Sequence, residues 1–104
     1  MNIMTKIIRT QEFVDNISKI KDDKLTTVIT QRLLRIKEGN FGDTKSIGDD
    51  VFELRIHYKA GYRIYYTIRK QEIIILLCSG SKSEQKKDII KAKLLAREVY
   101  LNGT

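Results

Sequence analysis

The chain has 104 residues, which suits one domain (residues 1–104) with a modest hydrophobic core. Hydrophobic residues make up 41% of the chain and charged residues 32%, a balance that excludes an intrinsically disordered protein. The net charge of +7 favours anionic partners, namely nucleic acid or an acidic protein and, as the least favoured alternative, a membrane surface, although this charge would also serve solubility alone.

No segment of the sequence has the features of a membrane-spanning helix or a signal peptide. The longest wholly apolar run, residues 73–78, is far too short to span a bilayer. The first residues lack the apolar core of a signal peptide. The single cysteine, Cys78, excludes an internal disulfide bond and is expected to be a buried, unreactive thiol. We therefore expect a cytoplasmic protein.

The N-terminal part of the chain predicts a strand and two helices. Residues 4–9 are apolar enough for the strand. A helix is predicted over residues 10–20, because Thr10 suits a helix start and apolar residues recur at helical spacing. A second helix is predicted over residues 24–38, and the Gly-Asn pair that follows would end it.

The C-terminal part predicts strands and a last helix. After a short segment, residues 44–47, residues 51–58 and 62–68 alternate apolar and polar side chains, as half-buried strands do. Residues 73–78 are apolar on both faces and predict a central strand covered from both sides. Residues 81–84 have the Ser-x-x-Glu spacing of a capping box, which predicts a helix behind it. The fold class is α+β, with helices on one side of the sheet.

The two alternating strands predict a hairpin with a definite register. The Lys-Ala-Gly sequence of residues 59–61 can close a three-residue loop with its glycine at positive φ. That loop places His57 opposite Arg63 and Arg55 opposite Tyr65. The sequence therefore predicts that these four side chains share the sheet face turned away from the core.

This predicted face is unusually basic. Glu53 is the only acid on it, beside Arg55, His57 and Arg63. Directly opposed cations cost up to about 1 kcal/mol, so a surface selected for stability alone would alternate its charges. A cationic patch with a tyrosine suits a phosphate backbone and a stacked base. The alternative is a solvated polar face that happens to be basic.

Three stretches of the chain are distinctive when their order and spacing are taken together. They read FVDNISKIKDD, GNFGDTKSIGDDVFELRIHYKAGYRIYY and IIILLCSGSKSEQKKDIIKAK. Together they resemble the RelE/ParE toxin superfamily, and most closely its HigB-like branch, the addiction module killer proteins of type II toxin–antitoxin systems. The resemblance implies a RelE-like fold, with two N-terminal helices packed on an antiparallel sheet of three to five strands and a C-terminal helix.

The resemblance also implies partners and an activity. It implies an antitoxin that is encoded by a neighbouring gene and is expected to contain a helix-turn-helix domain. The toxin would then contact DNA only indirectly, through its complex with the antitoxin. RelE-like members cut mRNA on the ribosome, whereas ParE-like members inhibit DNA gyrase without catalysis, and the fold does not separate them. We expect a ribosome-dependent endoribonuclease that arrests translation. Gyrase inhibition and an inactive RNA-binding module are the alternatives.

Site residues follow from the positions that match the family motifs. Arg55 and Arg63 are expected to be catalytic and to stabilise charge on the phosphate, with Lys82 as the next cation. His57 or Lys82 would transfer protons, although an exposed His57 without a role is an open alternative. The residues expected to bind RNA are Tyr65, Gln85 and Lys86, and for Tyr65 simple packing over Arg55 is the alternative.

The resemblance implies cleavage without a metal or cofactor, since the 2′-hydroxyl of the RNA attacks the adjacent phosphate. One histidine and one cysteine offer no paired metal ligands, in agreement with this expectation. The sequence departs from many RelE-like nucleases in one respect. Those proteins carry a tyrosine soon after the basic residue that follows the last strand, and residues 83–90 contain none here. The identity of the general acid is therefore left open.

Overall fold

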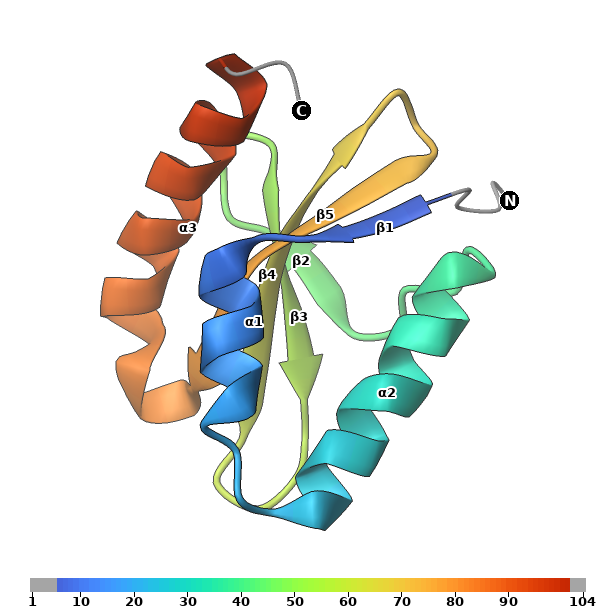
Figure 1. Ribbon diagram of the computed structural model, residues 1–104, viewed down its shortest axis with the longest axis vertical. Helices are drawn as coiled ribbons and strands as arrows, with labels where there is room; N and C mark the ends of the chain where they lie inside the picture. Colours follow the sequence, from blue (N-terminus) through green and yellow to red (C-terminus); the bar gives the residue numbers. More distant parts are fainter. Residues whose placement is uncertain (1–5, 102–104) are drawn as a thin grey trace.

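The computed structural model describes residues 6–101, which form a five-stranded sheet with three α-helices (Figure 1). The strands are β1 (Lys6–Arg9), β2 (Thr44–Ser46), β3 (Val51–Ile56), β4 (Tyr62–Arg69) and β5 (Ile73–Ser81). The helices are α1 (Gln11–Ser18), α2 (Asp23–Lys37) and α3 (Gln85–Leu101), the last preceded by a 3₁₀ turn at Lys82–Glu84. The predicted α+β class with a C-terminal helix is confirmed. The predicted start of the first strand, residues 4 and 5, lies outside the described residues.

The sheet is mixed, with strand order β1-β5-β4-β3-β2. Strands β3 to β5 form the predicted antiparallel meander, and the short segment before it adds β2, also antiparallel, to β3. Strand β1 pairs with β5 in parallel. Thr10, just after β1, explains this docking. Its backbone N–H bonds to the carbonyl of Leu76 and its hydroxyl to the carbonyl of Leu77, while the same hydroxyl caps α1 by accepting from the N–H of Phe13. No helix within residues 6–101 is long and apolar enough to cross a membrane.

Helices cover both faces of the sheet, so the prediction of helices on one side is wrong. Helices α1 and α2 pack on the face that includes Ile74 and Leu76, and α3 packs on the face that includes Ile75, Leu77 and Cys78. Figure 1 shows α2 (cyan) and α3 (red) on opposite sides of the strands. A bulge in β5 turns two successive residues toward α3. The predicted central strand, covered from both sides, is confirmed.

Cys78 lies in the core beneath α3. Burial raises the pKa of its thiol to about 12, so the thiol stays protonated at neutral pH. The predicted buried, unreactive cysteine is confirmed. The predicted capping box nearby is not formed, because the hydroxyl of Ser81 pairs with the hydroxyl of Ser83 instead of capping the helix.

The β3–β4 hairpin has a register two residues away from the predicted one. Arg55 lies opposite Arg63 and Glu53 opposite Tyr65, so the predicted pairs of His57 with Arg63 and of Arg55 with Tyr65 are wrong. The connection between the strands has five residues instead of three. Because the shift is two residues, each side chain keeps its predicted face of the sheet.

The longer connection is anchored to the start of α2. The hydroxyl of Tyr58 lies 3.2 Å and Nζ of Lys59 lies 2.9 Å from Oδ2 of Asp22. Asp22 is itself the N-cap of α2 and accepts from the N–H of Leu25 at 3.3 Å. Tyr58 therefore turns to Asp22 instead of pairing across the hairpin with Tyr62, and the strand pairing begins later than the sequence predicts.

We expect the Asp22 cluster to make stability depend on acidic pH. Hydrogen bonds from Lys59, from the backbone of Leu25 and from Tyr58 lower the pKa of Asp22 from 3.8 to about 2. A carboxyl whose pKa is lower in the folded state stabilises the fold above its unfolded pKa, and this contribution is lost as the pH falls through the folded pKa. The melting temperature of Asp22→Asn should lie below that of the wild type at neutral pH, and the gap should narrow as the pH drops from about 5 to about 2. A gap that stays constant across this range would contradict the prediction.

Gly80 allows α3 to start directly against β5. A Cβ added to Gly80 would lie 2.1 Å from Oδ2 and 3.2 Å from Cγ of Asp88, which is buried there. We expect Gly80→Ala to lower the free energy of unfolding by about 1–3 kcal/mol, because the buried carboxyl must move to make room. Chemical denaturation followed by circular dichroism would measure this, with the exposed change Gln31→Ala as control. Equal stability of Gly80→Ala and the control would contradict the expectation.

Candidate active site

The centre of the candidate site is the carboxylate of Glu53, which is 1% exposed. It lies where β3, β4 and the start of α3 meet. Its Oε2 accepts hydrogen bonds from the amide of Gln85 at 2.8 Å and from the hydroxyl of Tyr65 at 3.2 Å. Burial and the nearby charge of Glu53 raise the pKa of Tyr65, so its hydroxyl stays protonated and donates. Three elements thus hold this carboxylate in place.

Two arginines flank Glu53, and the three residues together are called the arginine site below. The Nε atom of Arg55 lies 3.7 Å from Oε1 of Glu53, and that of Arg63 lies 4.0 Å from Oε2. Directly opposed cations destabilise a sheet, and the carboxylate shared by Arg55 and Arg63 offsets this repulsion. Two positive charges and one negative charge leave the arginine site with a net positive charge.

The guanidinium groups are held in place by charge and packing. The side chain of Arg63 is only 11% exposed, and that of Arg55 is partly exposed. The Nε atoms of both are buried and, within residues 6–101, have no hydrogen-bond partner, so their contacts with Glu53 are ion pairs. The carbonyl of Arg55 is fixed from α2 by a hydrogen bond from Nη1 of Arg32 at 2.8 Å. The pair is therefore positioned by the protein before any ligand arrives.

His57 reaches the arginine site through a carboxylate. It lies in the β3–β4 connection, its side chain is 72% exposed, and its Nε2 is hydrogen-bonded to Asp43. The other oxygen of Asp43 is 3.9 Å from Nε of Arg55. The hydrogen bond with His57, and to a lesser degree the charge of Arg55, lower the pKa of Asp43. His57 thus belongs to the surroundings of Arg55, instead of facing Arg63 as predicted.

The remaining predicted site residues, Lys82 for catalysis and Tyr65, Gln85 and Lys86 for RNA binding, divide into two groups. Lys82 and Lys86 are exposed, and the backbone N–H of Lys82 bonds to the carbonyl of Gly61 at 3.1 Å, which brings the start of the last helix beside the hairpin connection. Gln85 and Tyr65 instead point to Glu53. The ring of Tyr65 is 0% exposed and packs against the core beneath α3, so the predicted stacking of a base on it is wrong in this structure.

The sequence analysis assigns no role in the site to three residues that the structure places in it or around it: Glu53, Asp43 and Arg32. For Glu53 a signal exists, because it is the only acid on the polar face of the hairpin. Asp43 and Arg32 lie outside the hairpin sequence, and only the folded chain brings them to Arg55. Within residues 6–101, no group of three or more His, Cys, Asp or Glu residues could hold a metal ion.

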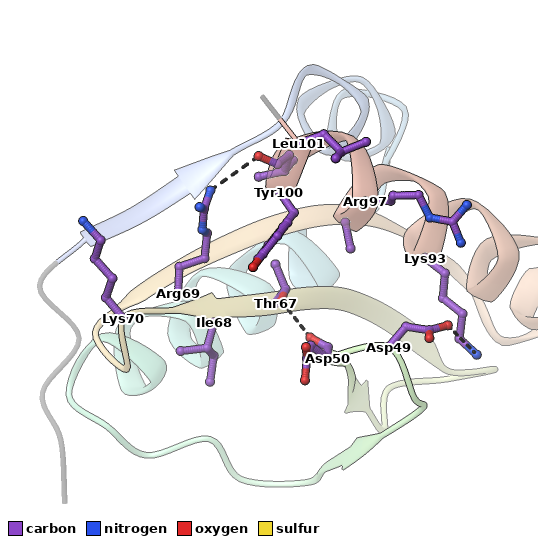
Figure 2. Close-up of a pocket in the computed structure, with 12 residues that line it drawn as sticks. Asp49, Asp50, Thr67, Ile68, Arg69, Lys70, Lys93, Arg97, Tyr100 and Leu101 are labelled. Atoms are coloured by element: carbon purple, nitrogen blue, oxygen red, sulfur yellow. Dashed lines mark hydrogen bonds and ion pairs between the residues drawn. The ribbon is translucent and has the colours of Figure 1, made fainter. Parts of the chain in front are cut away.

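A cavity of about 580 Å³ lies at the other end of β4, away from the arginine site (Figure 2). Its lining includes Arg69 and Lys70 from the end of β4 and its turn, and Arg97 and Tyr100 from α3. None of the residues predicted for catalysis or RNA binding lines it. The cavity and the arginine site are therefore separate features.

Comparison with known proteins places the chain in a family. Residues 12–100 match the family described as phage-derived protein Gp49-like (DUF891), and this match contains every predicted site residue. The chain is also 46% identical to an uncharacterised protein of Haemophilus influenzae (strain ATCC 51907 / DSM 11121 / KW20 / Rd) over 99 residues, which cover 94% of this chain and 100% of that protein. The chain therefore belongs to the phage-derived Gp49-like family, a family of RelE/HigB-type toxins whose activity implies an antitoxin partner.

Proposed function

We propose that this protein is a HigB-like toxin of a type II toxin–antitoxin system that cuts mRNA on the ribosome and so arrests translation in the cytoplasm. The observation that carries the proposal is the arginine site. Two opposed arginines on the inner strands β3 and β4 share one buried carboxylate and keep a net positive charge, and the side chain of Arg55 is partly exposed. Membership of the family supports the assignment as a toxin, but toxins of this fold include proteins that act without catalysis.

The arginine site suits the phosphate chemistry of RNA cleavage. The 2′-hydroxyl oxygen attacks the adjacent phosphorus, a new O2′–P bond forms, and the P–O5′ bond breaks. The proton of the 2′-hydroxyl goes to a base, and the leaving 5′-oxygen receives a proton from an acid. Negative charge grows on the non-bridging phosphate oxygens during this step. Arg55 and Arg63 would stabilise that charge, because guanidinium groups bind phosphate with paired N–H donors and stay protonated.

The exposed groups around the arginine site supply candidates for proton transfer and RNA binding. Nε2 of His57 is engaged by Asp43, so Nδ1 is the nitrogen that would accept the proton of the 2′-hydroxyl. Lys82 is the candidate acid, and Lys86 would contact the RNA backbone. Gln85 would act indirectly by holding Glu53.

Mapping of mRNA 5′ ends after brief induction in cells tests the proposal. We expect new ends inside translated codons, and none in untranslated RNA or when initiation is blocked. Intact messages together with growth arrest and DNA damage would overturn the proposal in favour of gyrase inhibition. Intact messages without growth arrest would overturn the proposal in favour of an inactive RNA-binding module.

A further inference from the structure

The cavity at the far end of β4, called the α3 pocket below, has a lining that is partly apolar and partly polar. Its apolar lining comes from Ala96, Val99 and Leu101 on α3, whereas Ile68 borders the cavity from β4 with its side chain turned to the other face of the sheet (Figure 2). Figure 2 shows Tyr100 projecting from α3 toward β4, and the Arg69 guanidinium lies 5.6 Å from the centre of its ring. At about 580 Å³ the pocket has room for one or two large apolar side chains of a partner.

The rim of the α3 pocket is charged, with an excess of cations. Its cations are Arg69, Lys70, Lys93 and Arg97, and its acids are Asp49 and Asp50. Lys93 pairs with Asp49 at 3.7 Å. Within residues 6–101, Lys70 and Arg97 are exposed and have no ion-pair partner. The rim is therefore complementary to carboxylates.

The outer face of α3 continues the apolar surface away from the pocket. Ile90, Leu94 and Leu101 are large, exposed apolar side chains. Their spacing of four and seven residues puts them on one side of the helix. Leu101 also lines the α3 pocket, so the stripe leads directly into it. Exposed aliphatic residues that gather on one helix face are typical of a surface that a partner covers.

The composition of the pocket favours a protein segment over nucleic acid. The cations of the rim would attract carboxylates and phosphates alike, so the apolar part of the lining decides between the two kinds of partner. The apolar lining offers nothing to phosphate or sugar, but it accepts an aliphatic or aromatic side chain. A segment with carboxylates beside an apolar side chain satisfies both the rim and the interior, as an amphipathic helix laid into a groove does.

We propose that the α3 pocket and the adjoining stripe on α3 form the docking surface for an acidic, amphipathic segment of the antitoxin. This inference rests on the proposed toxin–antitoxin function, but not on how the toxin acts. Arg63 and Arg69 are six positions apart on β4, which is about 20 Å of strand. The segment would thus dock away from the arginine site, and binding of the antitoxin and catalysis would depend on different residues.

Charge reversal of the rim tests this docking surface. The double variant Lys93→Glu/Arg97→Glu should bind the protein encoded by the neighbouring gene at least about 10-fold more weakly than the wild type, because two attractive contacts become repulsive. The matched control is Lys24→Glu/Arg35→Glu on the exposed side of α2, which should bind like the wild type. Purified proteins in the Arg63→Ala background avoid toxicity during expression, and isothermal titration gives the dissociation constants.

Growth assays with the intact arginine site complete the test. The rim variant should still arrest growth, which shows that it folds, and co-expression of the neighbouring protein should no longer rescue the cells. If the rim variant binds the neighbouring protein as tightly as the wild type does, the docking surface is overturned and the proposed function stays intact. The same conclusion follows if the rim variant loses affinity for a single-stranded RNA oligonucleotide and not for the neighbouring protein. Failure of the neighbouring protein to bind the wild type would overturn both. Weakened binding without growth arrest by the wild type would support the docking surface and overturn the proposed function.

Discussion

Replacing Arg63 with alanine should reduce mRNA cleavage by about 10²–10³-fold, the usual loss when one preorganised donor to a developing anion is removed. Arg63 is the more deeply held of the two arginines, with its side chain 11% exposed and its Nε 4.0 Å from Glu53. Because its guanidinium is already in position, no ordering of the side chain is needed when the RNA binds. The alanine variant loses both this fixed charge and the paired donors.

Two further variants separate charge from geometry at this position. Arg63→Lys keeps the charge but loses the planar fork, so we expect it to retain only part of the activity. Arg35→Ala on α2 removes an exposed arginine far from the hairpin sequence and should cleave like the wild type. Cleavage in a reconstituted translation reaction, quantified by primer extension, provides the rates. Wild-type cleavage by Arg63→Ala would exclude the arginine site as the catalytic centre.

Glu53→Gln should lower cleavage by at least about 10-fold without weakening RNA binding. Glutamine keeps the size of the side chain, but it removes the negative charge that lies between Arg55 and Arg63. The two guanidinium groups then repel each other and lose their common anchor. At the same time the site gains one unit of positive charge, which favours the binding of a polyanion. We therefore infer that Glu53 positions the arginines and does not itself contact RNA.

The separation of binding from cleavage distinguishes this role from a purely structural one. Fluorescence anisotropy with a 2′-O-methyl RNA oligonucleotide, which cannot be cleaved, measures affinity at fixed salt. Gln85→Ala is a matched control, because it removes the hydrogen bond to Oε2 of Glu53 but leaves the charge. We expect a smaller loss of cleavage for this control. Parallel losses of binding, cleavage and melting temperature in Glu53→Gln would show that Glu53 only supports the fold.

Local patterns predict most of the secondary structure and the shared faces of the strands. Thr10 caps the first helix as predicted, and Gly39, with φ of 89°, follows the end of the second. The run of residues 73–78 predicts a central strand because it is apolar on both faces, and both faces are buried in β5. Cys78 is inert for the same reason.

The hairpin shows where local patterns fail. Its predicted loop has three residues with a glycine at position 61, and local sequence offers no reason to extend it. The reason is a contact across the fold, in which Tyr58 and Lys59 bind Asp22 at the start of α2. Likewise, the burial of Tyr65 depends on α3, which crosses a face that the strand pattern alone marks as polar.

The sequence by itself determined that Glu53, Arg55, Arg63 and Tyr65 share one face of the sheet. Side chains alternate along a strand with a period of two, so this grouping survives a register shift of two residues. Only the tertiary structure decided which of these side chains touch. Packing of α3 buries Glu53 and Tyr65 and leaves the side chains of the two arginines incompletely buried, and anchoring of the hairpin to α2 sets Arg55 against Arg63. Such contacts depend on the relative positions of distant elements, which no local periodicity encodes.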